Sequence, residues 1–299
     1  MQVKNLFYLS AAAVLSLQGI GCNNTGGSNT DATGAAAVAD STLPPLETQA
    51  PNSNYKPAFA GQTRIGAVKT TTPYQVDQLD TGLLRPWAVI TMPDDRLLVT
   101  SKSGYMEIRG TDGKLQKKIT GFPKVDDAGQ GGLLDVALDP DFSSNKIIYW
   151  SFSEPYKQGN LTAVGKGMLN EAAGQVEHPV VIFRATPELN NSKQHYGSRL
   201  VFDKDGNLFV SAGERSVLEG RAQAQLLSAG LGKVFKITKD GKPAPGNPFL
   251  NDPKAMPEIY SYGHRNPQGL DINPATGELW EAEFGPRGGD EVNRILPGK

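Results

Sequence analysis

One pattern recurs four times along this chain, and it limits the possible folds more than any other feature. In each copy two short apolar runs flank a polar turn containing Asp, Asn, Gly or Pro. The copies are Trp87–Val99, Leu134–Trp150, Leu200–Val210 and Leu270–Trp280. Such a run–turn–run pattern is typical of a β-hairpin. The second runs begin roughly 50–70 residues apart, which indicates the blades of a β-propeller with insertions between them.

A β-sandwich is the alternative all-β fold for this sequence. Sandwich strands follow one another at intervals of about 8–12 residues and have no long repeat. The long period therefore favours the propeller. The 34 glycines and 21 prolines among 299 residues fit a turn-rich β protein. We expect one short helix around residues 222–227.

Composition also excludes some functions. The 30 Lys and Arg residues nearly balance the 31 Asp and Glu residues, so broad electrostatic attraction to nucleic acid is not expected. The chain has one cysteine, Cys22. A single cysteine excludes an internal disulfide and any site that needs several thiolates.

The N-terminal segment predicts export. Residues 1–21 combine Lys4 with a short apolar run, 6–17, that is too short to span a membrane. Cys22 follows directly, as the lipidated cysteine of a bacterial lipoprotein would; the alternative is an ordinary signal peptide with an incidental cysteine. Residues 22–62 are rich in small and polar residues and predict a low-complexity tether. We therefore expect a propeller over 63–299, in a periplasmic or outer-membrane lipoprotein that meets the membrane only through its lipid.

Polar residues that flank the third hairpin are candidates for chemistry. His195 lies just before it and Glu214 just after it. Both therefore flank the open end of the hairpin, where they can meet. A carboxylate that orients a histidine and stabilises its cation makes a working general base. The alternative is an ordinary surface histidine with a structural hydrogen bond.

Three further segments are rich in glycine, fixed donors and carboxylates: residues 126–132, 262–269 and 283–291. Backbone carbonyls and carboxylates suit a hard cation such as calcium. The Arg265–Asn266 pair suits an anionic or carbonyl-bearing planar ligand. The alternative is that the glycines only make turns and that Arg265 bridges two blades. Residues 203–207 could be mistaken for a calcium loop, but they lack its ligand spacing and predict a hairpin turn.

These segments together resemble the soluble PQQ-dependent aldose sugar dehydrogenases, relatives of soluble glucose dehydrogenase. The resemblance rests on Gly129–Leu134, His195 with Gly197 and Arg199–Leu200, Gly213–Arg215, Gly263–Gly269 and Gly285–Glu291. The run Gly-His-Arg-Asn-Pro-Gln-Gly at 263–269 is the most specific of them. The resemblance implies a six-bladed propeller with pyrroloquinoline quinone (PQQ) over its central channel, of which this chain carries about four blades.

The resemblance also implies residue roles. His195 would take the proton of the sugar C1 hydroxyl while hydride passes to the quinone and the aldose becomes a lactone, with Glu214 as its acidic partner. Arg265 would stabilise negative charge on the quinone. The implied cofactor contacts are Gln130, Arg265, Asn266 and Asp290, and the implied calcium ligands are Gly285, Pro286 and, for a second ion, Glu291. The electron acceptor is left open.

Two departures from the family pattern support a rival hypothesis. Phe284 stands where relatives carry His or Gln, and relatives continue beyond Lys299 into further blades with more cofactor and calcium ligands. We therefore expect either a fragment or a truncated product without its C-terminal blades. The rival is a non-catalytic propeller at the cell surface that binds a glycan or a protein partner.

Overall fold

The computed structural model describes residues 44–45, 48–50, 66, 73–286 and 289–299. The predicted signal peptide (1–21), the lipidation site Cys22 and most of the predicted tether lie outside the described residues, so these remain predictions. The chain divides into two compact units, and the account below concerns the one that contains Gln78–Lys299. Neither helix in the described part of the chain is long and apolar enough to cross a membrane.

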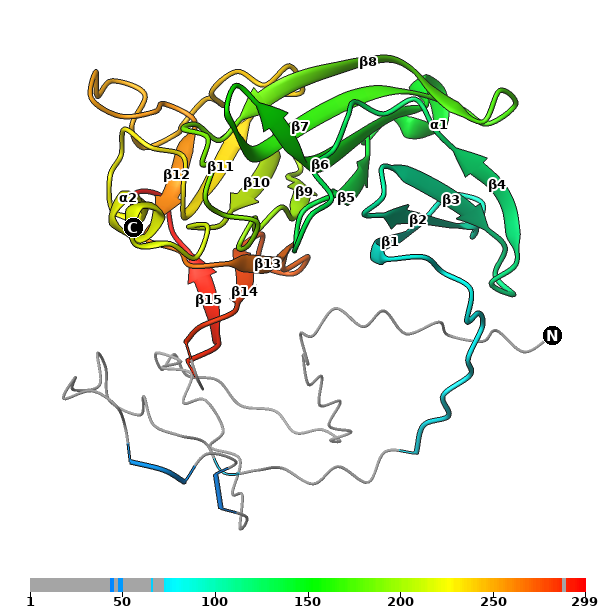
Figure 1. Ribbon diagram of the computed structural model, residues 1–299, viewed down its shortest axis with the longest axis horizontal. Coiled ribbons are helices and arrows are strands. Elements are labelled where there is room, and N and C mark those ends of the chain that lie inside the picture. The colour runs from blue at the N-terminus through cyan, green and yellow to red at the C-terminus, as the bar shows by residue number, and fades with distance from the viewer. Residues whose placement is uncertain (1–43, 46–47, 51–65, 67–72, 287–288) are drawn as a thin grey trace, which may run out of the picture. The chain divides into compact units, whose positions relative to one another are not determined.

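Four antiparallel sheets follow one another along the chain, which confirms the all-β propeller prediction (Figure 1). Blade 1 contains β1 (Pro86–Thr91), β2 (Leu97–Ser101), β3 (Tyr105–Arg109) and β4 (Leu115–Ile119). Blade 2 contains β5 (Leu133–Leu138), β6 (Ile147–Tyr156), β7 (Gly159–Asn170) and β8 (Gln175–Arg184). Blade 3 contains β9 (Leu200–Phe202), β10 (Leu208–Ala212), β11 (Lys233–Ile237) and β12 (Ile259–Tyr262). Blade 4 contains β13 (Pro267–Ile272), β14 (Leu279–Glu283) and β15 (Glu291–Ile295).

Each of the four predicted hairpins forms the first two strands of one blade. The third shows how the local sequence sets the turn: the Asp203 carboxylate accepts hydrogen bonds from the Asp205 and Asn207 amides at 2.9 and 2.8 Å. Gly206 takes the left-handed backbone conformation, with φ of 78°, which glycine adopts at little cost. This geometry confirms a hairpin turn at 203–207.

The blades pack face to face through apolar side chains. In blades 2 to 4, alternate residues of the second strand point toward the preceding blade. Ile148, Trp150 and Phe152 of β6 are buried in the cluster between blades 1 and 2, and Leu208, Val210 and Ala212 of β10 in the cluster between blades 2 and 3. The boundary between blades 3 and 4 has a smaller apolar cluster, which includes Phe209, Val234 and Leu279.

A buried hydroxyl joins each pair of neighbouring blades. Thr100, Ser151 and Ser211 occupy the same place in β2, β6 and β10. Their side-chain oxygens donate to backbone carbonyls of the next blade, those of Leu134 (2.6 Å), Ser198 (2.5 Å) and Pro267 (2.7 Å). The same oxygens accept amide protons from the first strand region of their own blade. These bonds set the first strands of adjacent blades side by side and bring the preceding loops to the same end of the propeller.

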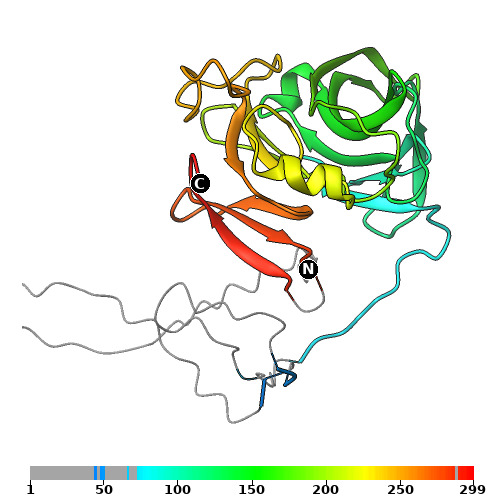
Figure 2. The same ribbon diagram turned by 60° about the vertical axis from the view of Figure 1, so that its left-hand side comes forward.

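Two short helices interrupt the sheets, α1 (Phe142–Asn145) and α2 (Leu218–Ala224). α2 thus overlaps the predicted helix at 222–227 but begins and ends earlier than predicted. The buried Lys233 side chain donates to the carbonyls of Gln223, Ala224 and Leu231 at 3.1, 2.7 and 2.7 Å. It therefore binds carbonyls at the end of the helix, which have no partner within the helix. Figure 2 shows α2 in yellow beside blade 3.

Candidate active site

The predicted base and its partner meet. Nδ1 of His195 lies 2.5 Å from Oε1 of Glu214, and both side chains are almost fully buried. Because a carboxylate can only accept, this contact places a proton on Nδ1 and leaves the lone pair of the neutral ring on Nε2. Nε2 makes no hydrogen bond with any residue that the structure describes. The pair is therefore arranged as a base with its proton-accepting nitrogen uncommitted.

The loop that carries His195 is held in an uncommon backbone conformation. His195 has φ of 48°, in the left-handed region that few non-glycine residues occupy. The buried guanidinium of Arg215 contacts this loop through the carbonyls of Gln194 (3.0 Å) and Ser192 (2.9 Å). Gly213 passes so close that a Cβ there would lie 2.2 Å from the His195 carbonyl oxygen. Close packing thus fixes the base before any ligand arrives.

Two amide side chains are oriented by the same loop. The Gln130 side-chain oxygen accepts the His195 amide proton at 2.8 Å, and the Asn266 side-chain oxygen accepts that of Gly197 at 3.1 Å. Their oxygens are therefore occupied, while their NH₂ groups donate to no residue in the described part of the chain. The structure brings Gln130, His195, Glu214 and Asn266 into one hydrogen-bond network.

Arg265 joins this network through its backbone and its side chain. Its carbonyl accepts the Glu214 amide proton at 2.8 Å. Its Nη1 donates to the carbonyls of Phe284 (2.6 Å) and Gly285 (3.1 Å), whereas Nε and Nη2 bond to no described residue. The guanidinium therefore retains donors for an anionic ligand.

The predicted calcium ligands lie next to Arg265. The Gly285 carbonyl already accepts from Arg265, and the Pro286 carbonyl accepts the Gly289 amide proton at 3.1 Å. The Asp290 carboxylate accepts the Gly285 amide proton at 2.9 Å, so Asp290 shapes the turn that presents these carbonyls. Glu291 bonds to Asn293 at 3.1 Å and is exposed at the start of β15. Phe284, at the same end, is 52% exposed.

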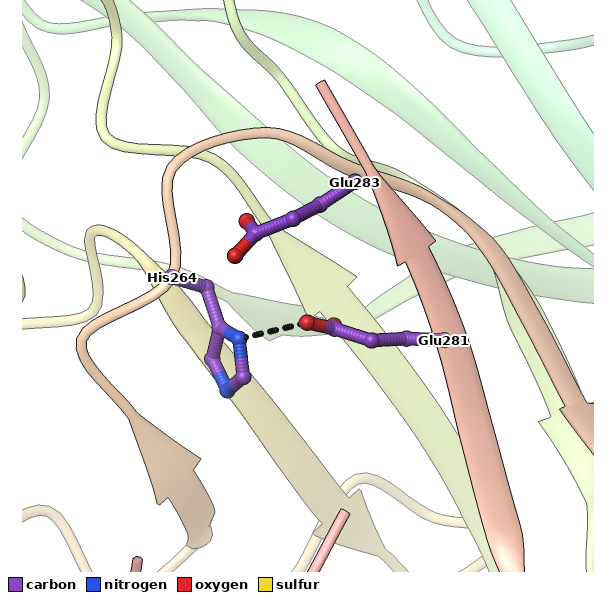
Figure 3. Close-up of side chains that lie close together, drawn as sticks. All are labelled: His264, Glu281 and Glu283. Carbon is purple, nitrogen blue, oxygen red and sulfur yellow. Dashed lines mark hydrogen bonds and ion pairs between the residues drawn. The ribbon is translucent and has the colours of Figure 1, made fainter. Parts of the chain in front are cut away.

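One cluster was not predicted from the sequence as a unit. His264, Glu281 and Glu283 lie together, with one potential ligand atom of each within 4.8 Å of the others (Figure 3). His264 Nδ1 is 2.8 Å from Glu281 Oε1, and its Nε2 is 2.8 Å from Ser261 Oγ. Burial, followed by the nearby Glu281 carboxylate, raises the pKa of Glu283. A comparison of the repeats could have found Glu281, because it stands where β6 has Trp150 and β10 has Val210.

The donor set fits a flat ligand that is rich in carbonyl and carboxylate oxygens. The structure offers two NH₂ groups and the Nε and Nη2 of Arg265 as free donors, while Nη1 of Arg265 is already bonded to two carbonyls. Beside them, the Nε2 lone pair of His195 is a free acceptor. PQQ, an ortho-quinone with carboxylates, has this chemistry. The two carbonyls at Gly285 and Pro286 suit calcium as oxygen donors, although a bound ion would compete with Arg265 for the Gly285 oxygen.

A cavity of about 420 Å³ lies elsewhere, against blade 1, and is lined by Leu79, Trp87 and Arg109 among others. None of the predicted site residues lines it. The candidate site is therefore identified from the side chains that meet there, and not from this cavity.

The fold and the site together define a β-propeller that presents a histidine–carboxylate pair and free donors where the loops of neighbouring blades meet. The sequence profile of the glucose/sorbosone dehydrogenase family matches residues 83–299, and the chain belongs to this family.

The names of similar proteins agree with this family assignment. The chain is 41% identical over 226 residues to aldose sugar dehydrogenase YliI of Escherichia coli, covering 75% of this chain and 60% of that protein. It is 30% identical over 243 residues to quinoprotein glucose dehydrogenase B of Acinetobacter calcoaceticus, covering 73% and 49%. The chain thus spans only about half to three fifths of the length of these relatives.

Solved structures show the same propeller. The apo-form of the soluble E. coli aldose sugar dehydrogenase matches with a TM-score of 0.68 and 40% identity, covering 73% of this chain and 62% of that one. The PQQ-bound aldose sugar dehydrogenase of Streptomyces coelicolor matches with a TM-score of 0.65 and 32% identity, covering 75% and 63%. The fold is therefore of the PQQ glucose dehydrogenase type.

Proposed function

We propose that this chain belongs to a PQQ-dependent enzyme that oxidises aldose sugars at C1 to the lactone. The observation that carries the proposal is the His195–Glu214 pair, with Nδ1 and Oε1 2.5 Å apart and Nε2 uncommitted. The names of the relatives, which include a PQQ-bound aldose sugar dehydrogenase, support the substrate class and the cofactor.

His195 acts as the general base. Its Nε2 accepts the proton of the C1 hydroxyl, and the ring becomes a cation that the buried Glu214 carboxylate stabilises at Nδ1. The proton thus ends on Nε2. Bound PQQ supplies the acceptor for the hydride that leaves C1, and this redox chemistry belongs to the cofactor. The His195 loop needs no large movement for this proton transfer, because Gln130 and Arg215 already hold it.

Four residues would hold the cofactor. Gln130 and Asn266 donate through NH₂ groups whose oxygens are fixed by the backbone of the His195 loop. Arg265 directs its free donors toward developing negative charge, which preorganised donors stabilise well in a site that excludes water. Asp290 contributes indirectly, through the Gly285 amide.

Calcium is part of the proposal. The carbonyls of Gly285 and Pro286 would bind the ion beside the cofactor, and Glu291 a second, structural ion. Calcium takes six to eight oxygen ligands, so the two carbonyls supply only part of the first ion's shell. Export and lipidation at Cys22 are also proposed from sequence; labelled-lipid incorporation that persists in Cys22→Ser would contradict the lipidation.

The test is turnover by the full chain loaded with PQQ and calcium, measured as dye reduction with several aldoses. We expect His195→Ala to lower the rate by about 10²- to 10⁴-fold, the usual contribution of a general base. His178→Ala, at an exposed histidine of β8, is the matched control and should not change the rate. Absence of PQQ-dependent turnover, or full turnover in His195→Ala, would refute the mechanism.

A non-catalytic binding function is the second candidate, because Phe284 is 52% exposed at the same end of the propeller. An exposed aromatic side chain is a common contact for protein partners. Titration of PQQ against the chain separates the two functions. Saturable binding with a shifted quinone absorbance favours the dehydrogenase, whereas glycan or protein binding without PQQ binding favours the alternative.

A further inference from the structure

Blade 4 departs from the pattern of the other blades where its second strand faces blade 3. The three core-facing side chains of β6 (Ile148, Trp150 and Phe152) and the three of β10 (Leu208, Val210 and Ala212) are apolar. The corresponding side chains in β14 are Leu279, Glu281 and Glu283. Two carboxylates thus replace residues that elsewhere build the apolar core.

This replacement is unfavourable by itself. The Glu281 side chain is fully buried, and its Oε2 has no hydrogen-bond partner in the described part of the chain. Burying a carboxylate oxygen without a partner costs stability, and a second carboxylate nearby adds repulsion. Unfavourable polar groups of this kind, kept inside a fold, are concentrated at functional sites.

The contacts of Glu283 show what the carboxylates can do. Its Oε2 accepts the amide protons of two consecutive residues, Arg265 at 2.7 Å and Asn266 at 3.2 Å. These are two of the three residues whose side chains present free donors at the candidate site, Gln130 being the third. One charged oxygen therefore fixes the backbone from which both donors project, and hydrogen bonds to a charged acceptor are stronger than neutral ones.

The contact between Glu281 and His264 supports the backbone that Glu283 binds. Glu281 Oε1 bonds to His264 Nδ1 at 2.8 Å, and His264 directly precedes Arg265 in the chain. Two carboxylates of β14 thus hold the turn. Glu283 bonds to its backbone amides, and Glu281 bonds to the side chain of His264, which precedes them. Figure 3 shows His264 and the two carboxylates grouped between the loop and β14.

We propose that Glu283 is a positioning residue for Arg265 and Asn266, with the Glu281–His264 pair as its support. The proposal rests on the proposed function, because it concerns how these two side chains are held for PQQ. It assigns Glu283 no contact with the cofactor or the sugar.

Two measurements on the full chain test it. The first is amide hydrogen exchange at residues 265 and 266 without cofactor, compared between wild type, Glu283→Gln and Glu283→Ala. Glu283→Ala should accelerate exchange at these amides by about tenfold or more, the loss expected for a charge-assisted hydrogen bond. Glu283→Gln keeps an acceptor oxygen and should give a smaller change. Glu278→Gln, at a partly exposed position of the same hairpin, is the control.

The second measurement is the Kd for PQQ, from the quinone absorbance, in the same variants. We expect Glu283→Ala to weaken binding about tenfold or more and Glu283→Gln to recover much of it. Unchanged exchange and a Kd within twofold of wild type in a folded Glu283→Ala protein would overturn the proposal. If wild type does not bind PQQ, the proposed function fails, whereas the exchange experiment still reports whether Glu283 fixes the turn.

Discussion

His195 and Glu214 meet across the open end of the first hairpin of blade 3, with Nδ1 2.5 Å from Oε1. The second oxygen of Glu214 is buried without a hydrogen bond and lies 3.7 Å from Nε of Arg221 on α2. The carboxylate is thus committed chiefly to the histidine.

Glu214→Gln should lower kcat for aldose oxidation by about 10²-fold or more, because a neutral amide stabilises the imidazolium less and can select the wrong tautomer. The measurement is dye reduction by the PQQ-loaded chain. Glu219→Gln, at an exposed position of α2, serves as the control. A kcat within twofold of wild type in Glu214→Gln would show that His195 works without its partner.

Asp135→Ala should destabilise the propeller by about 3 kcal/mol, the low end of the cost of breaking a buried ion pair. Asp135 is buried, and its carboxylate accepts from Nη1 of Arg199 at 2.8 Å and from the Leu200 amide at 2.7 Å. Arg199 also donates to the Gln268 carbonyl of blade 4 at 2.9 Å. Urea unfolding measures the loss.

The matched control for this pair is Glu278→Gln, which removes an exposed ion pair with Arg294. Exposed pairs contribute at most about 1 kcal/mol. Equal losses in Asp135→Ala and in the control would mean that the pair between blades 2 and 3 adds nothing beyond a surface contact.

Thr100→Val should cost about 1–3 kcal/mol, because it keeps the shape of the side chain but leaves the Ala88 amide and the Leu134 carbonyl without their partner. Unfolding by urea measures this loss as well. Thr111→Val, at an exposed position between β3 and β4, is the comparison. A loss no larger than that of Thr111→Val would contradict the role of the hydroxyl in joining blades.

Lys233 should make stability depend on pH. Burial lowers the pKa of Lys233 to about 7, whereas an unfolded lysine titrates near about 10.4. Between these values the unfolded chain binds more protons than the folded one, so the free energy of unfolding rises with pH, by up to about 1.4 kcal/mol per unit. The slope falls to about half of its maximum near pH 7, the folded-state pKa, and disappears at lower pH.

Urea unfolding between pH 6.5 and 9 measures the effect, and Lys233→Met should lack that part of the slope. Parallel slopes in the two proteins would instead show that the three carbonyls around Nζ keep Lys233 charged in the folded state.

The sequence predicted the blades because hairpin signals are local. Alternating apolar residues and turn residues such as Asp203 and Gly206 act within a few positions, so each hairpin could be placed without knowing its neighbours. The predicted position of α2 was less accurate. The carbonyls at the end of this helix are bound by Lys233, which lies outside the segment predicted to be helical.

The candidate site was predicted in part, through a resemblance and through the placement of His195 and Glu214 around one hairpin. The Glu281–Glu283 pair was not recognised as a unit, since a glutamate in an alternating strand usually faces solvent. Only a comparison with Trp150 and Val210 in the other blades shows that Glu281 faces the core.

By itself, then, the sequence determined the all-β class, the repeated hairpins and the residues worth suspecting. The tertiary structure decided which of them meet: Asn266 with Gly197, Arg265 with Gly285, and Glu283 with the backbone of Arg265. These contacts join residues that are 18 to 69 positions apart in the sequence. Hydrogen bonding depends on distances of about 3 Å in space, which the spacing of residues along a chain does not specify.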